Sequence, residues 1–156
     1  MSIAAEVLDL ATRRGATLAT AESCTGGLIA ARLTDVPGCS GAFHCGFVTY
    51  DNQAKIDLLG VRQETLDRVG AVSEEVAREM ADGARARSGS ALVVSVTGIA
   101  GPGGSEHKPE GRVCFGLARA DHPTHVETVE FGALGRSAVR DAASDHAFAL
   151  LLRALS

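Results

Sequence analysis

The chain has 156 residues, of which 46% are apolar and 22% charged, and its formal net charge at pH 7 is −4. This composition fits one domain over residues 1–156, excludes an intrinsically disordered chain, and argues against a broad nucleic-acid-binding surface. No apolar stretch approaches the ~18 residues of a membrane span, and charged residues between Glu6 and Arg14 interrupt any signal-peptide pattern. We therefore expect a cytoplasmic protein with neither a nucleic acid nor a membrane as partner.

Helices and strands are predicted to alternate along the chain. Apolar residues at helical spacing predict helices, and short runs rich in β-branched or aromatic residues predict strands. In chain order we expect a helix over 4–14, a strand over 16–21, a helix over 28–33, a strand over 42–50, and helices over 51–59, 63–69 and 73–88. Strands over 91–96, 112–120 and 126–131 and a closing helix from about Arg136 to Leu155 follow.

Helix boundaries carry their own signals. Asp51 and Ser73 are placed to cap the N-termini of two helices, because their side-chain oxygens accept hydrogen bonds from free backbone N–H groups. Gly15, Gly60 and Gly70 stand where C-terminal caps are expected. The alternation of elements predicts a three-layer α/β/α sandwich with a mixed, mostly parallel sheet.

The segment Ala21–Gly27 joins a predicted strand to a predicted helix through a tight turn and contains Ser23. The N-terminus of a helix offers free backbone N–H groups and a dipole that favours negative charge. Such a turn suits either a bound phosphate or a nucleophilic serine hydroxyl.

A second glycine cluster, residues 98–104, follows the most apolar predicted strand. Gly98, Gly101 and Gly103 would let the backbone approach a ligand and direct N–H groups at an anion. The spacing matches neither a Walker A loop nor the dinucleotide-binding fingerprint. The alternative is a flexible surface loop without a ligand.

Tyr50 and Lys55 lie at another strand-to-helix junction. A serine hydroxyl needs a base to become a good nucleophile, and none of the five histidines has an evident Ser-His-Asp arrangement. A partly desolvated Lys55 that takes the proton of Ser23 is the better candidate. The alternatives are a packing role for Tyr50 and a solvated surface position for Lys55.

Arg136 and Arg140 begin the final helix, where a cation is unfavourable for the helix dipole, and this indicates an anionic ligand. A plain surface role for each arginine is the alternative. The four cysteines show no C-x-x-C spacing, so we expect four free thiols. Cys24 is the one exception to a purely structural role, since a helix start would lower the pKa of its thiol.

Taken together these segments resemble one family, the C-terminal domain of the competence/damage-inducible protein CinA, whose stand-alone members include nicotinamide-nucleotide amidases. The resemblance covers essentially the whole chain. It rests on Ala21–Gly27, Gly46–Tyr50 with Asn52 and Lys55, Gly70–Ser73, Thr97–Gly104, and Lys108-Pro109 with Gly111. Full-length CinA-type proteins carry an additional N-terminal domain, whose activities are not carried over to this chain.

The resemblance implies hydrolysis of the carboxamide of nicotinamide mononucleotide to nicotinate mononucleotide and ammonia, without a metal or other cofactor. It implies Ser23 as nucleophile, Lys55 as base with Tyr50 nearby, and Thr97 as a residue that assists at the reacting centre. A homo-oligomer is compatible with it.

For the remaining site residues we predict roles from their chemistry. Backbone N–H groups of Thr25, Gly26 and Gly27, or of the loop with Gly98, Gly101 and Gly103, would stabilise an oxyanion. Arg136 or Arg140 would hold the 5′-phosphate of a small nucleotide substrate, and Asn52 would complete the substrate-binding set.

Two alternatives remain open at this point. The chain would be a non-catalytic nucleotide-binding module of the competence/damage type, or an amidase that acts on another small amide.

Overall fold

The computed structural model describes residues 1–156 and contains six α-helices, one 3-10 turn and five strands. Every predicted element is present, and the 3-10 turn is an addition. The elements are α1 (Ile3–Arg14), β1 (Leu18–Glu22), α2 (Leu28–Thr34), η1 (Cys39–Gly41), β2 (Phe43–Val48), α3 (Asn52–Leu59), α4 (Gln63–Val69), α5 (Glu74–Ser88), β3 (Leu92–Gly98), β4 (Arg112–Arg119), β5 (His125–Glu130) and α6 (Arg136–Leu155). None of the helices combines the length and apolarity that crossing a membrane requires.

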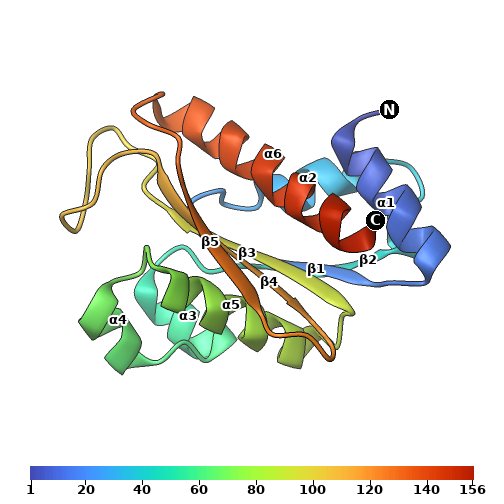
Figure 1. Ribbon diagram of the computed structural model, residues 1–156, viewed down its shortest axis with the longest axis horizontal. Helices are drawn as coiled ribbons and strands as arrows, with labels where there is room; N and C mark the ends of the chain where they lie inside the picture. Colours follow the sequence, from blue (N-terminus) through green and yellow to red (C-terminus); the bar gives the residue numbers. More distant parts are fainter.

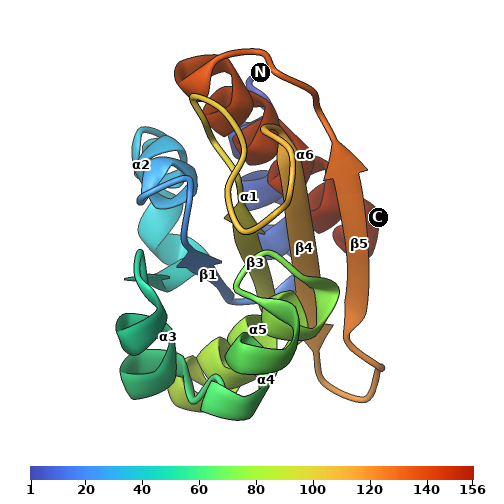
Figure 2. The same cartoon turned by 90° about the vertical axis from the view of Figure 1, so that its left-hand side faces the viewer.

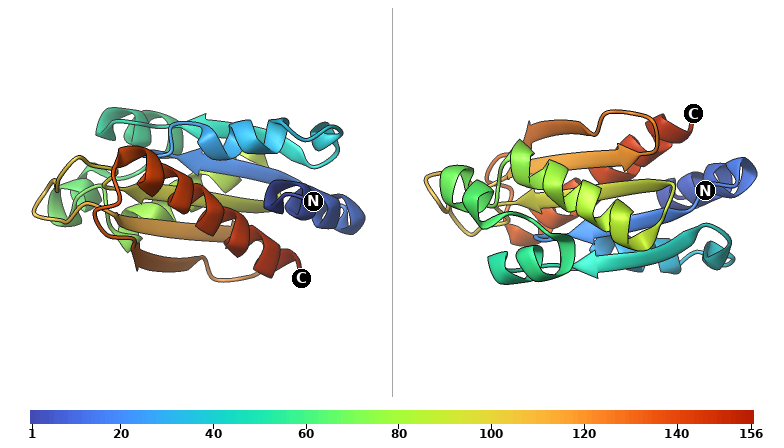
Figure 3. Two further views of the ribbon diagram at one scale, coloured as in Figure 1. Left: turned by 90° about the horizontal axis from the view of Figure 1, so that it is seen from above. Right: turned by 90° about the horizontal axis from the view of Figure 1, so that it is seen from below.

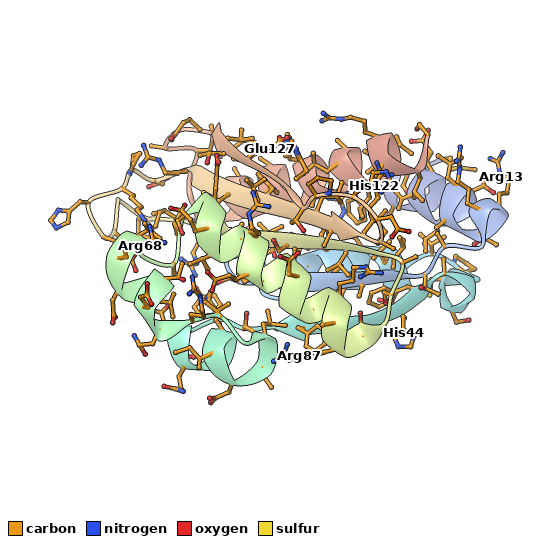
Figure 4. All side chains as sticks on the ribbon, turned by 60° about the horizontal axis from the view of Figure 1, so that its bottom comes forward. Arg13, His44, Arg68, Arg87, His122 and Glu127 are labelled. Atoms are coloured by element: carbon orange, nitrogen blue, oxygen red, sulfur yellow. The ribbon has the colours of Figure 1, made fainter.

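The five strands form one sheet in the order β2-β1-β3-β4-β5. β1 pairs in parallel with β2 and β3, whereas β4 pairs antiparallel with β3 and β5. Four of the five strands thus point the same way, and the predicted mixed α/β sheet is confirmed. His44 on β2 and Glu127 on β5 mark the two edges of the sheet in Figure 4.

Helices cover both faces of the sheet (Figures 1 and 3). One face carries α1, α2 and α6, and its core of 22 buried residues includes Phe115, Phe148 and Leu151. The other face carries α3, α4 and α5 over a smaller buried cluster that includes Leu59 and Met80. The longer helices α1, α5 and α6 each bury an apolar face, in agreement with the helical spacing of their apolar residues.

The capping predictions hold at most positions. The side chains of Asp51 and Ser73 accept hydrogen bonds from Ala54 N at 2.8 Å and Val76 N at 3.2 Å. Gly15 and Gly60 end their helices in the left-handed conformation. Gly70 also has a positive φ of 78°, but its ψ of 169° sends the chain away from α4 in an extended course instead of closing the usual cap.

Two strands end later than the sequence pattern indicates. β1 continues to Glu22, which pairs with Val48 and Val96 on its two neighbours. β3 continues to Gly98, which pairs with Val113. Backbone pairing with neighbouring strands extends both elements past their apolar runs.

The carboxyl ends of β1, β2 and β3 therefore meet at one edge of the sheet, which Figure 2 views with the Gly-rich loop in front. The chain leaves β1 into α2 on one face and leaves β2 into α3 on the other. Open α/β sheets bind ligands at such a divergence.

The close approach of α3 to α5 fixes the position of α3 at this edge. A Cβ atom at Gly83 of α5 would lie 1.8 Å from the carbonyl oxygen of Leu59, so only glycine fits there. This contact with α5 holds α3, and with it Lys55, in place on that face of the sheet.

Candidate active site

A cavity of about 310 Å³ opens where β1, β2 and β3 end. It lies between the turn after β1, the start of α3, the Gly-rich loop and the start of α6. The predicted site residues on its lining are Ser23, Tyr50, Asn52, Lys55, Thr97, Gly98, Gly101, Gly103 and Arg136. The other predicted residues, Thr25, Gly26, Gly27 and Arg140, do not line it.

Lys55 and Ser23 are in direct contact. Lys55 Nζ lies 2.9 Å from Ser23 Oγ and donates to the carbonyl oxygens of Thr49 at 2.9 Å and Tyr50 at 3.3 Å. Lys55 is only 1% exposed and Ser23 7%. The lysine is therefore a buried partner of the serine, not a solvated surface residue.

The surroundings of Lys55 suit a neutral amine. A neutral amine has two N–H groups, which can donate hydrogen bonds to the two carbonyl oxygens. Its one lone pair is then left to accept a hydrogen bond from the hydroxyl of Ser23. Burial lowers the pKa of Lys55 from its usual value of 10.5, because desolvation disfavours the ammonium form. Negative charge at Asp51 and Glu106 acts in the opposite direction but is the smaller influence.

The prediction of a low pKa for Cys24 is wrong. Burial raises the pKa of its thiol to about 11, and the weaker influences of Lys55 and Arg140 do not offset this. The side chain packs in the apolar core between the sheet and α6 instead of facing the helix dipole. The thiol is protonated at neutral pH, which leaves the Ser23 hydroxyl as the nucleophile candidate of this turn. All four cysteines are free, as predicted.

Glu22, which the sequence analysis did not single out, occupies the N-terminus of α2. Its fully buried carboxylate accepts hydrogen bonds from Ile29 N and Ala30 N, each at 3.0 Å, and from Thr25 Oγ1 at 2.6 Å. The N–H groups of Ile29 and Ala30 at the start of α2 are thus satisfied within the protein and are not free for a ligand. Thr25 turns its hydroxyl to Glu22 instead of the cavity.

Arg140 supports the same turn from α6. Its Nε donates to the carbonyl oxygen of Cys24 at 3.1 Å and its Nη2 to that of Thr25 at 2.9 Å. Gly26 donates its N–H to the carbonyl oxygen of Ser23 at 3.0 Å. The turn after β1 is therefore held from one side by Glu22 and from the other by Arg140.

Arg136 lies at the rim of the cavity. Its guanidinium donates to the carbonyl oxygen of Gly101 at 2.6 Å and to the phenol oxygen of Tyr50. Tyr50 is 58% exposed, so its ring stands at the mouth while its backbone carbonyl faces Lys55 below. The structure thus joins the Gly-rich loop, the β2–α3 junction and α6 through one arginine.

Thr97 and the Gly-rich loop form the opposite wall. Thr97 is buried and donates its hydroxyl hydrogen to the carbonyl oxygen of Ala71 at 2.9 Å. The Glu110 carboxylate accepts from Gly103 N at 2.7 Å and from Gly135 N at 2.9 Å, which fastens the loop to the start of α6. The N–H of Gly103 is therefore engaged and is not free to bind an anion.

Three carboxylates were missed by sequence reasoning, namely Glu22, Glu106 and Glu110. An acidic residue at the end of an otherwise apolar strand, directly before a helix start, was a usable signal for Glu22. Glu106 lines the cavity from within the Gly-rich loop, and its position depends on loop conformation, for which the sequence carries no periodic signal. No three His, Cys, Asp or Glu side chains gather in a group that could hold a metal ion.

Comparison with known proteins places this chain in a family. The CinA C-terminal domain matches residues 1–155. A CinA-like protein of Chlorobium phaeobacteroides is 64% identical over 111 residues, which cover 70% of this chain and 26% of that protein. The chain spans 24% to 36% of the length of the curated relatives that it matches.

Solved structures agree over nearly the full chain. The competence/damage inducible protein CihA of Agrobacterium tumefaciens has a TM-score of 0.93 and 44% identity, covering 98% of this chain and 93% of that one. The competence damage-inducible protein A of Klebsiella pneumoniae has a TM-score of 0.94 and 37% identity, with coverage of 98% and 94%. The chain belongs to the CinA C-terminal domain family.

Proposed function

We propose that this protein is an amidase that hydrolyses the carboxamide of nicotinamide mononucleotide through an acyl-enzyme on Ser23. The observation that carries the proposal is the buried contact of 2.9 Å between Lys55 Nζ and Ser23 Oγ. A binding site alone has no need of a desolvated amine against a serine hydroxyl. The resemblance to stand-alone nicotinamide-nucleotide amidases supplies the substrate.

In the first half of the reaction, Ser23 Oγ attacks the carboxamide carbon while its proton passes to the neutral amine of Lys55. The tetrahedral intermediate then collapses, the C–N bond breaks, and the Lys55 ammonium returns the proton to the leaving nitrogen, which departs as ammonia. An ester between Ser23 and the nicotinoyl group remains.

In the second half, water attacks the ester carbon and gives its proton to Lys55. The C–O bond to Ser23 then breaks, the serine oxygen recovers a proton from Lys55, and nicotinate mononucleotide leaves. One lysine thus acts as base and acid in turn, and the lowering of its pKa by burial favours the neutral base that begins each half.

The oxyanion of both intermediates would be stabilised by the backbone N–H of Cys24, the residue that follows the nucleophile. Cys24 lines the cavity, and its N–H donates to no backbone carbonyl, whereas that of Gly26 is engaged. The N–H after the nucleophile serves this role in other serine hydrolases.

Thr97 and Arg136 would orient the substrate. The hydroxyl hydrogen of Thr97 is committed to Ala71, so its oxygen offers only acceptor capacity, which suits the NH₂ group of a carboxamide. The guanidinium of Arg136 at the rim suits the 5′-phosphate, with Tyr50 and Asn52 beside it.

Ammonia release from nicotinamide mononucleotide by the purified protein, with the Ser23→Ala variant alongside, tests the proposal. We expect release by the unmodified protein and none by the variant, which should still bind the nucleotide. A folded protein that binds the nucleotide without turnover would favour the non-catalytic binding module. Turnover of a different small amide only would keep the chemistry and replace the substrate.

A further inference from the structure

The cavity contains one acidic side chain among its lining residues, Glu106. The two basic side chains on the lining are Lys55 and Arg136. When Lys55 is the neutral base that the mechanism needs, the remaining formal charges are a negative one at Glu106 and a positive one at Arg136. A carboxylate on the wall of a site expected to bind an anionic nucleotide requires an explanation.

The carboxylate of Glu106 is held in place by its loop. Ser105 and Lys108 exchange two backbone hydrogen bonds of 3.0 and 2.8 Å, which close a tight turn around Glu106 and His107. Both central residues have positive φ, 51° and 62°, a conformation that costs non-glycine residues free energy. The turn is retained because Lys108 anchors it.

Lys108 fastens the turn to the segment between α4 and α5. Its Nζ donates to the carbonyl oxygens of Val69 at 2.7 Å and Val72 at 2.6 Å, and lies 3.9 Å from a Glu106 oxygen. The carboxylate packs over Gly70, where a Cβ atom would lie 2.5 Å from Glu106 Oε2. The ion pair is long, at 3.9 Å, and 42% of the Glu106 side chain is exposed, so Lys108 offsets the charge of Glu106 only in part.

Nicotinamide mononucleotide carries two opposite charges. Its pyridine ring is attached to ribose through nitrogen and is a cation, and its phosphate is an anion. The cavity presents Glu106 and Arg136 as two opposite charges on its wall and rim. Glu106 lines the same cavity as Lys55, the residue in contact with the nucleophile Ser23.

We propose that Glu106 supplies the counter-charge for the pyridinium ring, so that the site selects cationic pyridine carboxamides over neutral ones of nearly the same shape. This inference rests on the proposed function and deepens it. Selectivity would come from the Glu106 carboxylate, which its loop holds in place before the substrate binds. The loop then does not have to reorganise on binding, so no free energy is lost in ordering it.

A pair of ligands that differ in ring charge tests the proposal. Nicotinamide mononucleotide and its dihydro form share ribose, phosphate and carboxamide, but the dihydropyridine ring is neutral. Dissociation constants are measured by calorimetry on Ser23→Ala protein, which prevents turnover, and on the same protein with Glu106→Gln. The matched control is Glu64→Gln, which removes an exposed acid on α4 that does not line the cavity.

We expect Glu106→Gln to weaken binding of the cationic nucleotide about tenfold and that of its dihydro form less than twofold. Glu64→Gln should change neither. In protein that retains Glu106, raising the salt concentration should also reduce the preference for the cationic ligand, because salt screens the attraction between Glu106 and the charged ring. Salt weakens the phosphate contacts of both ligands equally, so that effect cancels in the comparison. This second measurement keeps the test valid if Glu106→Gln disturbs the loop.

Equal weakening of both ligands by Glu106→Gln, together with a preference that salt does not change, would overturn the inference and leave the amidase proposal intact. Failure of the unmodified, folded protein to bind nicotinamide mononucleotide at all would overturn both.

Discussion

Lys55 Nζ lies 2.9 Å from Ser23 Oγ although the two residues are 32 positions apart and belong to different layers of the fold. Ser23 follows a strand of the sheet, and Lys55 lies on the first turns of a helix that packs against one face. The same amine donates to the carbonyl oxygens of Thr49 and Tyr50. Its position is therefore fixed by contacts with the oxygens of Ser23, Thr49 and Tyr50, which come from two chain segments.

Activity should rise with pH along a limb governed by Lys55. The base must be neutral, so turnover is lost as pH falls through the pKa of Lys55, which burial places below 10.5. A pH profile of kcat with nicotinamide mononucleotide should show a slope of about one on its acidic side. Lys55→Arg retains a positive charge but no usable base, and we expect no turnover from it at any pH. A profile of kcat with no acidic limb at any pH below 10.5 would contradict the assignment of Lys55 as base.

The stability of the protein should depend on pH in the same direction, because of the same burial of Lys55. Because the pKa of Lys55 is lower in the folded state, the unfolded chain binds more protons between the two pKa values. Stability contributed at this position is therefore greatest at high pH and is lost as pH falls toward the folded pKa. Relative to Lys55→Met, the unmodified protein should lose at most about 1.4 kcal/mol per pH unit over that window.

Urea unfolding of both proteins between pH 7 and 10.5 measures this difference, and other titrations cancel between them. A stability difference that does not vary with pH would mean that the ammonium is not destabilised by burial. The variant also leaves the carbonyl oxygen of Thr49 without its donor, which adds a loss of about 1–3 kcal/mol that does not depend on pH.

The two arginines of α6 should separate into different roles. Arg136 lines the cavity and Arg140 holds the turn after β1. Arg136→Ala should raise KM for nicotinamide mononucleotide about tenfold to a hundredfold and leave nicotinamide riboside, which has no phosphate, nearly unchanged. Arg140→Ala should lower kcat for both substrates and reduce stability.

Steady-state kinetics with both substrates gives the comparison directly. Equal losses on nucleotide and riboside in Arg136→Ala would remove the phosphate contact from the proposal. A phosphate-dependent loss in Arg140→Ala would exchange the two assignments.

Glu22 should be a positioning residue for Ser23. Glu22→Gln removes an acceptor and places an NH₂ group against a backbone N–H of Ile29 or Ala30, so one buried donor loses its partner. We expect a loss of about 1–3 kcal/mol in unfolding free energy, with kcat reduced more than KM is raised, because the turn that carries the nucleophile shifts. Urea unfolding and kinetics check both effects, with Glu64→Gln as control. Full activity in Glu22→Gln would show that the turn is held without this carboxylate.

The periodic and capping signals were sufficient for the elements but not for all of their ends. Apolar spacing predicted all six helices and five strands, and Asp51 and Ser73 cap as expected. The ends of β1 and β3 were missed by one or two residues, since Glu22, Thr97 and Gly98 continue the strands through pairing with neighbours. Such pairing is a long-range property that a local pattern does not contain.

The sequence by itself determined the fold class, the family and the selection of Ser23, Lys55, Tyr50 and Thr97, because motif, periodicity and residue chemistry are local. The tertiary structure alone decided which groups face the cavity. It buried Cys24 and raised the pKa of its thiol, directed the Glu22 carboxylate to the start of α2, and assigned Arg136 to the rim and Arg140 to the turn. The physical reason is that desolvation and hydrogen bonding depend on which distant segments pack together, and that packing exists only in the folded chain.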